Sequence, residues 1–563
     1  MKDGADQQGK SLNHQITKSP NLFFLFALIF TAIFLLHAPL LRLPYFWDEA
    51  GYYVPAARDV LLHGSLVPQS TLTSGHPPLV MAWLALWWKL SGYTVAVART
   101  AMLLIAAFAL LGVFQLGRRV ANSQVALAAA ICTALYPPFF SQSAMLHIDL
   151  PAGAFTVWGL YFYLQDRRLA TITLFSLAAL AKETAIVAPL ALFAWELFLW
   201  VVARRMNAGS PPKKAAIYLV RGNHYHPLRS LPQSALFLLA PLLPLGAWYA
   251  YHYSETGYLL AAPEYFRYNV AQTLHPLRMV LSFIKRIWHL LGFMHMFLLT
   301  AGAAIALRLP PLSDEDGNLR PRIAPAVQMV FAVVIAAYVV MLSVVGGAPL
   351  VRYLLPVVPL VILLCVSTLW RRVAQWKIAV AVVCAGFVLA LVINPPYPFA
   401  PEDNLAYRDF ILLHRQAADV LTSRYPTARV LTAWPATDEL SKPYLGYVQR
   451  ALPVVPIEDF SAEHLLPAAR DTSLYDVGLL FSTKYEPAAD LLRAVPFWER
   501  WQKRFFHFHR NVPPQLAAQL LGGRLVFEQW RRGQWVAIVE IERPQNAAKS
   551  SGDVASIQRQ RRY

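Results

Sequence analysis

Hydrophobic side chains occur in long runs over the first two-thirds of this chain, and short clusters of Lys and Arg separate the runs. A helix needs about 20 apolar residues to cross the hydrocarbon core of a bilayer, and most of the runs approach that length. The pattern is typical of an α-helical polytopic membrane protein. We expect about eleven transmembrane helices, at residues 21–41, 94–117, 122–140, 150–166, 169–181, 184–203, 233–252, 287–307, 325–345, 353–370 and 377–394.

The charge of the chain supports a membrane topology. Its 50 Lys and Arg residues outnumber its 32 Asp and Glu residues, and the excess lies at the ends of apolar runs. This placement is typical of positive-inside loops and not of a nucleic-acid surface. The basic loops fall on one side if the amino terminus is cytoplasmic and residues 77–90, a short Trp-rich segment, form an interfacial helix on the outer face. An odd number of spans then places the carboxyl terminus outside the cytoplasm.

The composition changes after Asn394, where prolines end the last apolar helix and no later run could span a membrane. The rest predicts a soluble α/β domain with a helix at 405–424. Strands are expected at 429–433, 454–457, 477–482, 524–529 and 534–541, the last two forming a hairpin around Gly533. The predicted organisation is a cytoplasmic arm (1–20), a membrane domain (21–395) with a large first outer loop (42–93), an extracytoplasmic α/β domain (396–543) and a disordered basic tail (544–563).

This topology brings polar residues from several loops to the outer face of the membrane. Because they share one side, we expect a single site there. The residues are Asp48, Glu49, Asp59, His76, His147, Asp149, Lys182, Glu183, Glu255, Glu264 and Arg352.

The adjacent carboxylates Asp48 and Glu49 are the first candidates for catalysis. Trp47 and Tyr52-Tyr53 flank them with an aromatic surface that suits a sugar, so the pair could supply a general base. Alternatively, Asp48 caps the helix that begins at Glu49, and a cap can coexist with a catalytic role. Asp149 opens a later span and is open to the same two interpretations, since an ionisable residue at a membrane helix end is costly without a partner.

Two cations at outer helix ends run against the positive-inside trend. Lys182 and Arg352 could clamp a lipid-linked phosphate, Lys as a point charge and Arg through its planar fork. The alternative is that both side chains simply snorkel to the interface. We add His76, Tyr53 and Tyr353 as candidates for substrate binding.

A divalent cation is the one cofactor that the residues suggest. Asp48, His76 and Asp149 could bind it through carboxylate and imidazole groups. Their spacing, however, matches no metal-binding motif.

Five short elements follow one another in a characteristic order. They are Trp47-Asp48-Glu49-Ala50, His76-Pro77-Pro78-Leu79, Asp149, Lys182 before a span, and Arg352-Tyr353-Leu354-Leu355-Pro356. In this order they resemble the GT-C membrane glycosyltransferases, specifically the bacterial group similar to protein O-mannosyltransferases and the aminoarabinose transferase of lipid A. The resemblance covers roughly residues 20–395. One departure is that Gly75-His76 replaces the acidic and basic residues of the aminoarabinose transferases, which does not favour lipid A as the acceptor.

The resemblance implies a GT-C-like fold in the bacterial inner membrane. It implies a polyprenyl-phosphate-sugar donor held in membrane lipid, an envelope acceptor that is a protein, a lipid or a glycan, and transfer with inversion at the anomeric centre. In these terms Asp48 is the base, and Lys182 and Arg352 face the donor phosphate. Asp149 and Glu49 support the acceptor pocket or the base.

Two other functions stay open at this point. A transporter or flippase of lipid-linked saccharides would share the membrane class and the lipid partner, but transporters usually place ionisable residues near mid-bilayer and contain repeated halves. A non-catalytic scaffold that binds an envelope partner would not depend on Asp48.

Overall fold

The computed structural model describes residues 21–207, 218–221, 224–227, 235–263, 275–345, 347–485, 487, 495, 497–506 and 508–542. The chain forms two compact units, Met1–Arg408 with Ala489–Phe506, and Asp409–Ala488 with His507–Tyr563. The predicted arm (1–20), the predicted tail (544–563) and Glu264 lie outside the described residues.

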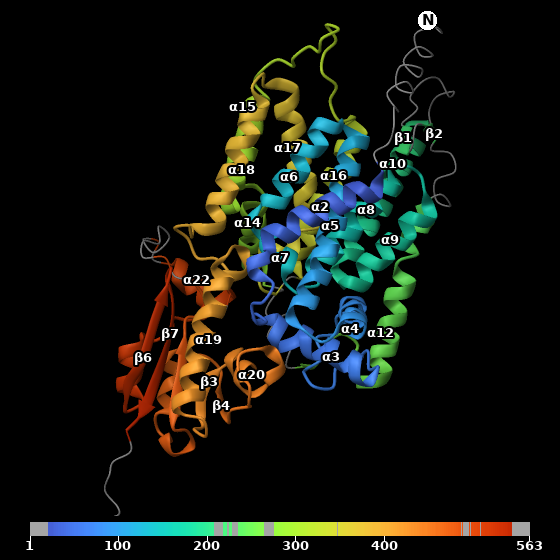
Figure 1. The fold of residues 1–563 in the computed structure, drawn as a ribbon. Helices are drawn as coiled ribbons and strands as arrows, with labels where there is room; N and C mark the ends of the chain where they lie inside the picture. Colours follow the sequence, from blue (N-terminus) through green and yellow to red (C-terminus); the bar gives the residue numbers. More distant parts are fainter. Residues whose placement is uncertain are drawn as a thin grey trace, which may run out of the picture. The chain divides into compact units, whose positions relative to one another are not determined.

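The first unit is mostly helical, as the apolar runs predict (Figure 1). Its first elements are α2 (Leu22–His37), η1 (Ala38–Leu40), η2 (Glu49–Tyr53), α3 (Val54–His63), α4 (Leu79–Ser91), α5 (Val95–Val120), α6 (Ser123–Leu135), α7 (Pro137–Ala144), α8 (Asp149–Tyr163), α9 (Arg168–Ala181), η3 (Glu183–Ile186) and α10 (Val187–Asn207). The paired strands β1 (Tyr218–Arg221) and β2 (His224–Pro227) follow. The later elements are η5 (Leu236–Leu239), α12 (Leu242–Thr256), α14 (Pro276–Leu291), η6 (Phe293–His295), α15 (Met296–Ala306), α16 (Pro325–Val344), η7 (Val351–Leu354), α17 (Val358–Arg372), α18 (Trp376–Val392), η8 (Pro401–Asp403) and α22 (Trp498–Phe506).

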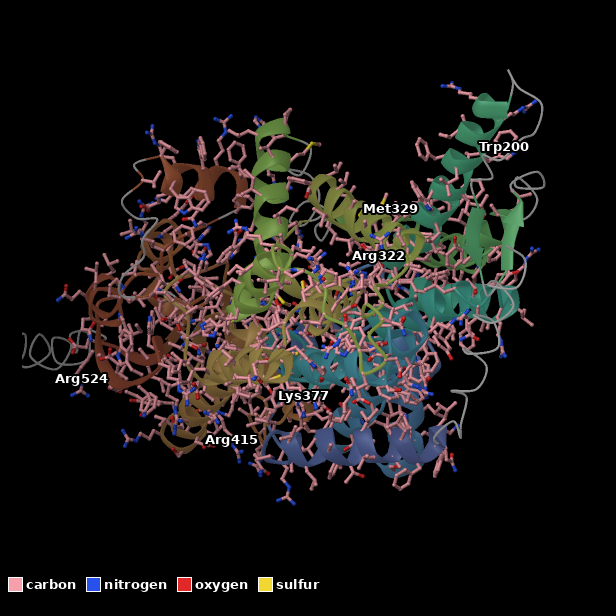
Figure 2. The ribbon with its side chains drawn as sticks, turned by 90° about the horizontal axis from the view of Figure 1, so that it is seen from above. Trp200, Arg322, Met329, Lys377, Arg415 and Arg524 are labelled. Atoms are coloured by element: carbon pink, nitrogen blue, oxygen red, sulfur yellow. The ribbon has the colours of Figure 1, made fainter. Side chains whose placement is uncertain are left out.

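The described helices make this a multi-pass membrane protein. Among the described residues, five helical stretches are long and apolar enough to cross a membrane: Leu22–Leu40, Val95–Val120, Glu183–Val202, Pro276–Ala306 and Pro325–Val344. The pair α6 and α7 passes the same test together, and α4, α9 and α18 are shorter apolar helices. Exposed basic side chains flank these helices, among them Arg322 before α16 and Lys377 in α18 (Figure 2). The predicted total of about eleven spans stays a prediction.

Prolines and a left-handed residue divide some of the predicted spans. The predicted span at 122–140 is not one straight helix, because the chain bends by 68° between α6 and α7. Pro137 begins the new helix, since proline lacks a backbone N–H and clashes with the preceding turn. The predicted span at 287–307 is likewise two helices, α14 and α15, and Met294 between them has a φ of 47°. The helix predicted at 353–370 begins later, as α17.

Small residues allow α5, α8 and α9 to pack closely, and Figure 1 shows the three side by side. A Cβ atom on Gly112 of α5 would lie 2.8 Å from Trp158 Nε1 of α8. One on Gly159 of α8 would lie 2.6 Å from Phe175 Cε1 of α9. Larger side chains would push these helices apart, so the glycines fix the scaffold from which α8 and α9 present their ends.

The second unit is built on a five-stranded sheet with the order β4-β3-β5-β7-β6. β3 is parallel to β4 and β5, while β7 is antiparallel to β5 and β6. All predicted strands and the hairpin at Gly533 are confirmed. The strands are β3 (Val430–Ala433), β4 (Val454–Ile457), β5 (Val477–Phe481), β6 (Gly523–Arg531) and β7 (Gln534–Ile541). The helical elements are α19 (Ala406–Arg424), which leads into the unit, α20 (Ala436–Ser441), η9 (Pro443–Leu445), α21 (Ala462–Ala468), η10 (Thr472–Leu474) and α23 (Pro514–Leu520).

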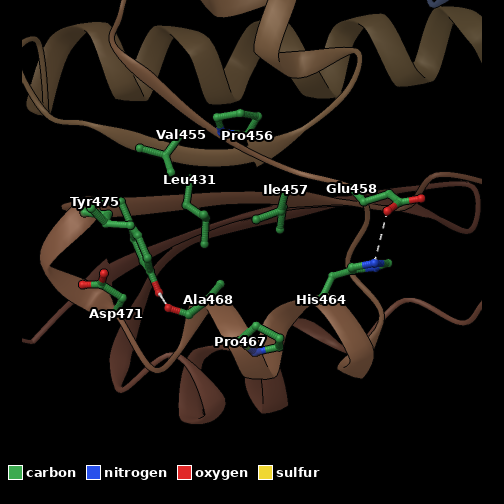
Figure 3. A pocket seen from close by; sticks show the side chains of 11 residues that line it. Leu431, Val455, Pro456, Ile457, Glu458, His464, Pro467, Ala468, Asp471 and Tyr475 are labelled. Carbon is green, nitrogen blue, oxygen red and sulfur yellow. Dashed lines mark hydrogen bonds and ion pairs between the residues drawn. The ribbon is translucent and has the colours of Figure 1, made fainter. Parts of the chain in front are cut away.

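A hollow in the second unit lies between β4 and α21 (Figure 3). Its lining is mainly apolar and includes Val455, Ile457 and Pro467. At one end His464 Nε2 lies 3.3 Å from Glu458 Oε2. Two polar side chains that line this hollow, His464 and Glu458, therefore pair with each other.

Candidate active site

Asp48 stands at the start of an unusual turn. Trp47 has a left-handed φ of 45°, and Glu49–Tyr53 form one turn of π-helix. Strained residues and π-turns are frequent at functional sites, where the surrounding structure holds them in place. The Asp48 carboxylate makes no capping hydrogen bond to this turn and instead pairs with Arg352 Nη2. The structure therefore does not support the capping alternative for Asp48.

Glu49 has different partners from its neighbour and is fully buried. Its Oε1 accepts a hydrogen bond from Leu146 N at 2.7 Å, and its Oε2 accepts one from Phe46 N at 2.6 Å. Both oxygens lie 3.2 Å from the guanidinium of Arg99, which is also fully buried and donates to three backbone carbonyl oxygens. Glu49 thus ties the first outer loop to α5. Arg99 was not among the residues predicted from sequence, although a single Arg one turn into an apolar helix is a signal for a buried partner.

Arg352 lies at the centre of the cluster, and three carboxylates surround its guanidinium. It belongs to η7 and is buried. Its Nη2 pairs with Asp48, its Nε lies 3.3 Å from Asp149 Oδ2, and its Nη1 lies 2.7 Å from Glu402 Oε2. His147 Nδ1 lies 3.2 Å from the same Nη1. Asp48 and Arg352 are thus brought together, as predicted, and Glu402 joins them from the segment after α18.

Lys182 is the second cation of the cluster. Its Nζ lies 2.5 Å from Asp149 Oδ1 and 3.7 Å from the centre of the Tyr353 ring. A close approach of two elements makes this possible: a Cβ on Gly153 of α8 would lie 3.3 Å from the backbone carbon of Leu355. Asp149 is the first residue of α8, so the positive end of the helix dipole also favours its carboxylate.

His76 and Tyr53 lie beside this cluster. His76 Nδ1 lies 2.8 Å from Glu183 Oε2, and Glu183 follows Lys182 directly in sequence. The ring of Tyr53 lies between two histidines, 5.8 Å from the His147 ring and 6.5 Å from the His76 ring. The structure therefore places all the predicted substrate-binding side chains in one neighbourhood of the first unit.

Two further charged residues approach the cluster and were missed from sequence. Glu402 was assigned to the soluble domain, and no motif marks it. Arg286 of α14 is fully buried, its Cζ lies 5.5 Å from the centre of the Tyr353 ring, and it donates to the backbone carbonyls of residues 348 and 350. Arg278, Ser282 and Arg286 recur at every fourth residue of α14, and this spacing was the available signal for an inward polar face.

The cluster holds three carboxylates (Asp48, Asp149 and Glu402) against two cations (Lys182 and Arg352). Burial raises the pKa of Glu402 to about 7, and Asp48 and Asp149 act in the same direction while Arg352 opposes them. Glu402 therefore changes charge near neutral pH.

The predicted metal site does not fit these surroundings. In the part of the chain that the structure describes, no group of three or more His, Cys, Asp or Glu side chains is arranged to hold a metal ion. Asp48 and Asp149 face Arg352 and Lys182, which would repel a divalent cation, and His76 is bonded to Glu183. We therefore assign no step to a metal.

Asp59 and Glu255 were also predicted at the outer face, but they do not belong to the cluster. Asp59 Oδ2 accepts hydrogen bonds from Gln69 N and from Ser70 N and Oγ, so it shapes the first outer loop. Glu255 is exposed near the end of α12. These two carboxylates therefore supply no group to the cluster.

Comparison with known proteins supports the resemblance to glycosyltransferases. Residues 75–220 match the family model described as dolichyl-phosphate-mannose-protein mannosyltransferase. A search of curated proteins finds no match. The matched segment contains His76, Asp149 and Lys182, whereas Asp48 and Arg352 lie outside it.

Solved structures share the fold along nearly the whole chain. The apo structure of ArnT from Cupriavidus metallidurans has a TM-score of 0.50 and 14% sequence identity, and the match covers 91% of this chain and 97% of ArnT. The structure of the same protein bound to undecaprenyl phosphate has a TM-score of 0.50 and 13% identity, with 94% and 98% coverage. At this identity the match shows the fold alone. Together with the family model, it confirms the resemblance to GT-C membrane glycosyltransferases.

Proposed function

We propose that this protein is an inverting membrane glycosyltransferase that moves a sugar from a polyprenyl-phosphate donor to an envelope acceptor, with Asp48 as the general base. One observation carries the proposal. The Asp48 side chain keeps 18% of its surface exposed, while those of the other two carboxylates, Asp149 and Glu402, keep only 2% and 5%. Asp48 is thus the carboxylate of the cluster that an acceptor hydroxyl can reach.

To act as a base, Asp48 must be held in a fixed direction. The Arg352 guanidinium does this, because its ion pair with the carboxylate holds the side chain in place. In the transfer step the acceptor oxygen bonds to the anomeric carbon while its proton passes to Asp48. The bond from the anomeric carbon to the phosphate oxygen breaks, and polyprenyl phosphate leaves with the bonding electrons. Attack from the face opposite the phosphate inverts the anomeric centre.

The donor phosphate is proposed to lie beside Tyr353. The charges of Lys182, Arg352 and Arg286 lie 3.7, 5.6 and 5.5 Å from the centre of this ring. Carboxylates already balance Lys182 and Arg352, whereas Arg286 donates to backbone carbonyl oxygens among the described residues. A buried, unbalanced guanidinium favours an anion, and cations near the leaving phosphate stabilise the charge that develops on it.

A lipid-linked donor suits the rest of the molecule. ArnT, which shares the fold, binds undecaprenyl phosphate, and this supports a polyprenyl phosphate as the donor carrier here. A donor of this kind can enter from the bilayer with its tail in lipid. We propose an outer-face site in the bacterial inner membrane, with the amino terminus cytoplasmic and the carboxyl-terminal domain outside the cytoplasm.

The test is a transfer assay with purified full-length protein. Radiolabelled undecaprenyl-phosphate sugars and envelope extract should yield a labelled acceptor with the wild type. Asp48→Asn should fold but transfer more slowly by about 10²-fold or more, because the proton acceptor is lost. Glu255→Gln, which removes an exposed carboxylate on α12, is the matched control and should transfer normally. Transfer by Asp48→Asn at the wild-type rate would show that the base is another residue.

A further inference from the structure

The segment that follows α18 is folded back onto the end of that helix. Asn404 Nδ2 donates to Ala390 O at 3.2 Å and lies 3.1 Å from Asn394 Oδ1. Leu405 N donates to Leu391 O at 3.2 Å. Two residues after the turn are thus bonded to three residues at the end of α18, so η8 is a fixed feature of the first unit and not a loose linker.

This fold-back places Glu402 against the predicted catalytic groups. Glu402 is 4% exposed, and its Oε2 lies 2.7 Å from Arg352 Nη1. Its other oxygen, Oε1, is buried without a hydrogen-bond partner among the described residues. Burying a carboxylate is costly unless its partner repays the lost hydration, so a structural role alone gives a poor account of this residue.

Three edges of the Arg352 guanidinium face three different carboxylates. Nη1 and Nη2 donate hydrogen bonds to Glu402 and Asp48, and Nε lies 3.3 Å from Asp149 Oδ2 in an ion pair without a hydrogen bond. The guanidinium is planar and rigid, so fixing two of its nitrogens determines where the third one points. Glu402 and Asp149 together therefore set the position of Nη2, and with it the direction of the Asp48 carboxylate.

We propose that Glu402 is a positioning residue for glycosyl transfer: it holds Arg352 so that Arg352 in turn orients Asp48. This inference rests on the proposed function, since it assigns Asp48 the role of base. It adds the segment leading out of α18 to the active site. The membrane helices alone then leave the site incomplete.

The first test measures transfer against donor concentration for Glu402→Ala. Because Glu402 acts through Arg352 and touches neither substrate, kcat should fall about 10- to 100-fold while the donor KM changes by less than about 2-fold. Glu402→Gln keeps an oxygen that can accept from Arg352 and should retain more activity than Glu402→Ala. In the Asp48→Asn background, Glu402→Ala should cause no further loss, because the residue it positions is gone.

Asp403→Asn is the matched control for these variants. Asp403 is the next residue, is equally buried, and has no ion pair with Arg352 among the described contacts. Burial raises its pKa well above the usual range, and Asn keeps the size and shape of its side chain. Asp403→Asn should transfer like the wild type. A loss equal to that of Glu402→Ala would assign the effect to the turn as a whole and overturn the proposal.

A second measurement tests the contact between Glu402 and Arg352 independently of the proposed transfer activity. If the wild type transfers no sugar from any donor offered, the proposed function fails, and the contact is then tested through stability. Melting temperatures in detergent for Glu402→Gln, Arg352→Gln and the double variant should be non-additive if Glu402 holds Arg352. Additive shifts would overturn the positioning role, as would an equal loss of transfer for Glu402→Ala in the wild-type and Asp48→Asn backgrounds.

Discussion

Replacing Glu49 by Gln tests whether the two adjacent carboxylates have separate roles. The change keeps the size of the side chain but removes the charge that balances the completely buried Arg99. Removing one partner of a buried ion pair typically costs about 3–5 kcal/mol. The new amide also turns an NH2 group toward one of two backbone N–H donors that now lie 2.6 and 2.7 Å from the carboxylate. Such an orphaned donor costs about 1–3 kcal/mol, so we expect a destabilisation of roughly 4 kcal/mol or more.

The assay is unfolding of the purified full-length protein in detergent, with transfer measured on the same samples below the melting range. Asp48→Asn is the matched control, because it also converts an acid to its amide in the same turn. It should lose transfer and keep its stability, since Asp48 is partly exposed and makes no hydrogen bond within the turn. Arg99→Met should destabilise as Glu49→Gln does, and the double variant should lose less than the two losses combined.

The opposite pattern would refute this reasoning. If Glu49→Gln melts like the wild type but transfers no sugar, Glu49 acts on the substrate and the anchoring role is wrong. Additive losses in the double variant would show that Glu49 and Arg99 act independently.

Four further predictions can be checked separately. Arg352→Lys keeps the charge but loses the fork, so transfer should fall at least about 10-fold with little change in melting temperature; a lowered melting temperature with normal kinetics would make the residue structural. The pKa of Glu402, raised by burial from 4.5 to about 7, means that the folded protein binds an extra proton between these values. Its contribution to stability is therefore present at low pH and lost as the pH rises through 7, and Glu402→Gln should flatten that part of the curve of melting temperature against pH. Gly75→Ala should destabilise the first outer loop, since φ is +72° and the new Cβ would lie 1.5 Å from a backbone carbonyl oxygen; normal stability would contradict this packing. An alkaline phosphatase fusion at Ser550 should be active if the carboxyl terminus lies outside the cytoplasm, and an active cytoplasmic reporter at that position would overturn the topology.

The paired residues 48 and 49 show where sequence reasoning reaches its limit. Two adjacent acids are equivalent candidates in a linear pattern. The left-handed backbone at Trp47 and the π-turn after it separate them, so that Asp48 meets Arg352 while Glu49 meets Arg99. These directions depend on contacts with helices that lie far along the chain.

Local information in the sequence was enough to predict most helices and strands and many of the residues of the site. Apolar runs predicted the membrane helices, short β-branched runs predicted the five strands, and helix ends on one side of the membrane predicted that Asp48, Asp149, Lys182 and Arg352 would meet. Each of these signals acts within one helix or one loop.

The tertiary structure alone decided which charges pair and which prolines bend the chain. Asp48 and Arg352 are 304 positions apart, and Glu402 reaches Arg352 only because the chain folds back onto α18. Glu402 lies in a stretch whose local pattern marks no site. A buried charge is stable only beside its partner, and that partner is determined by the packing of the whole unit and not by neighbouring residues in the sequence.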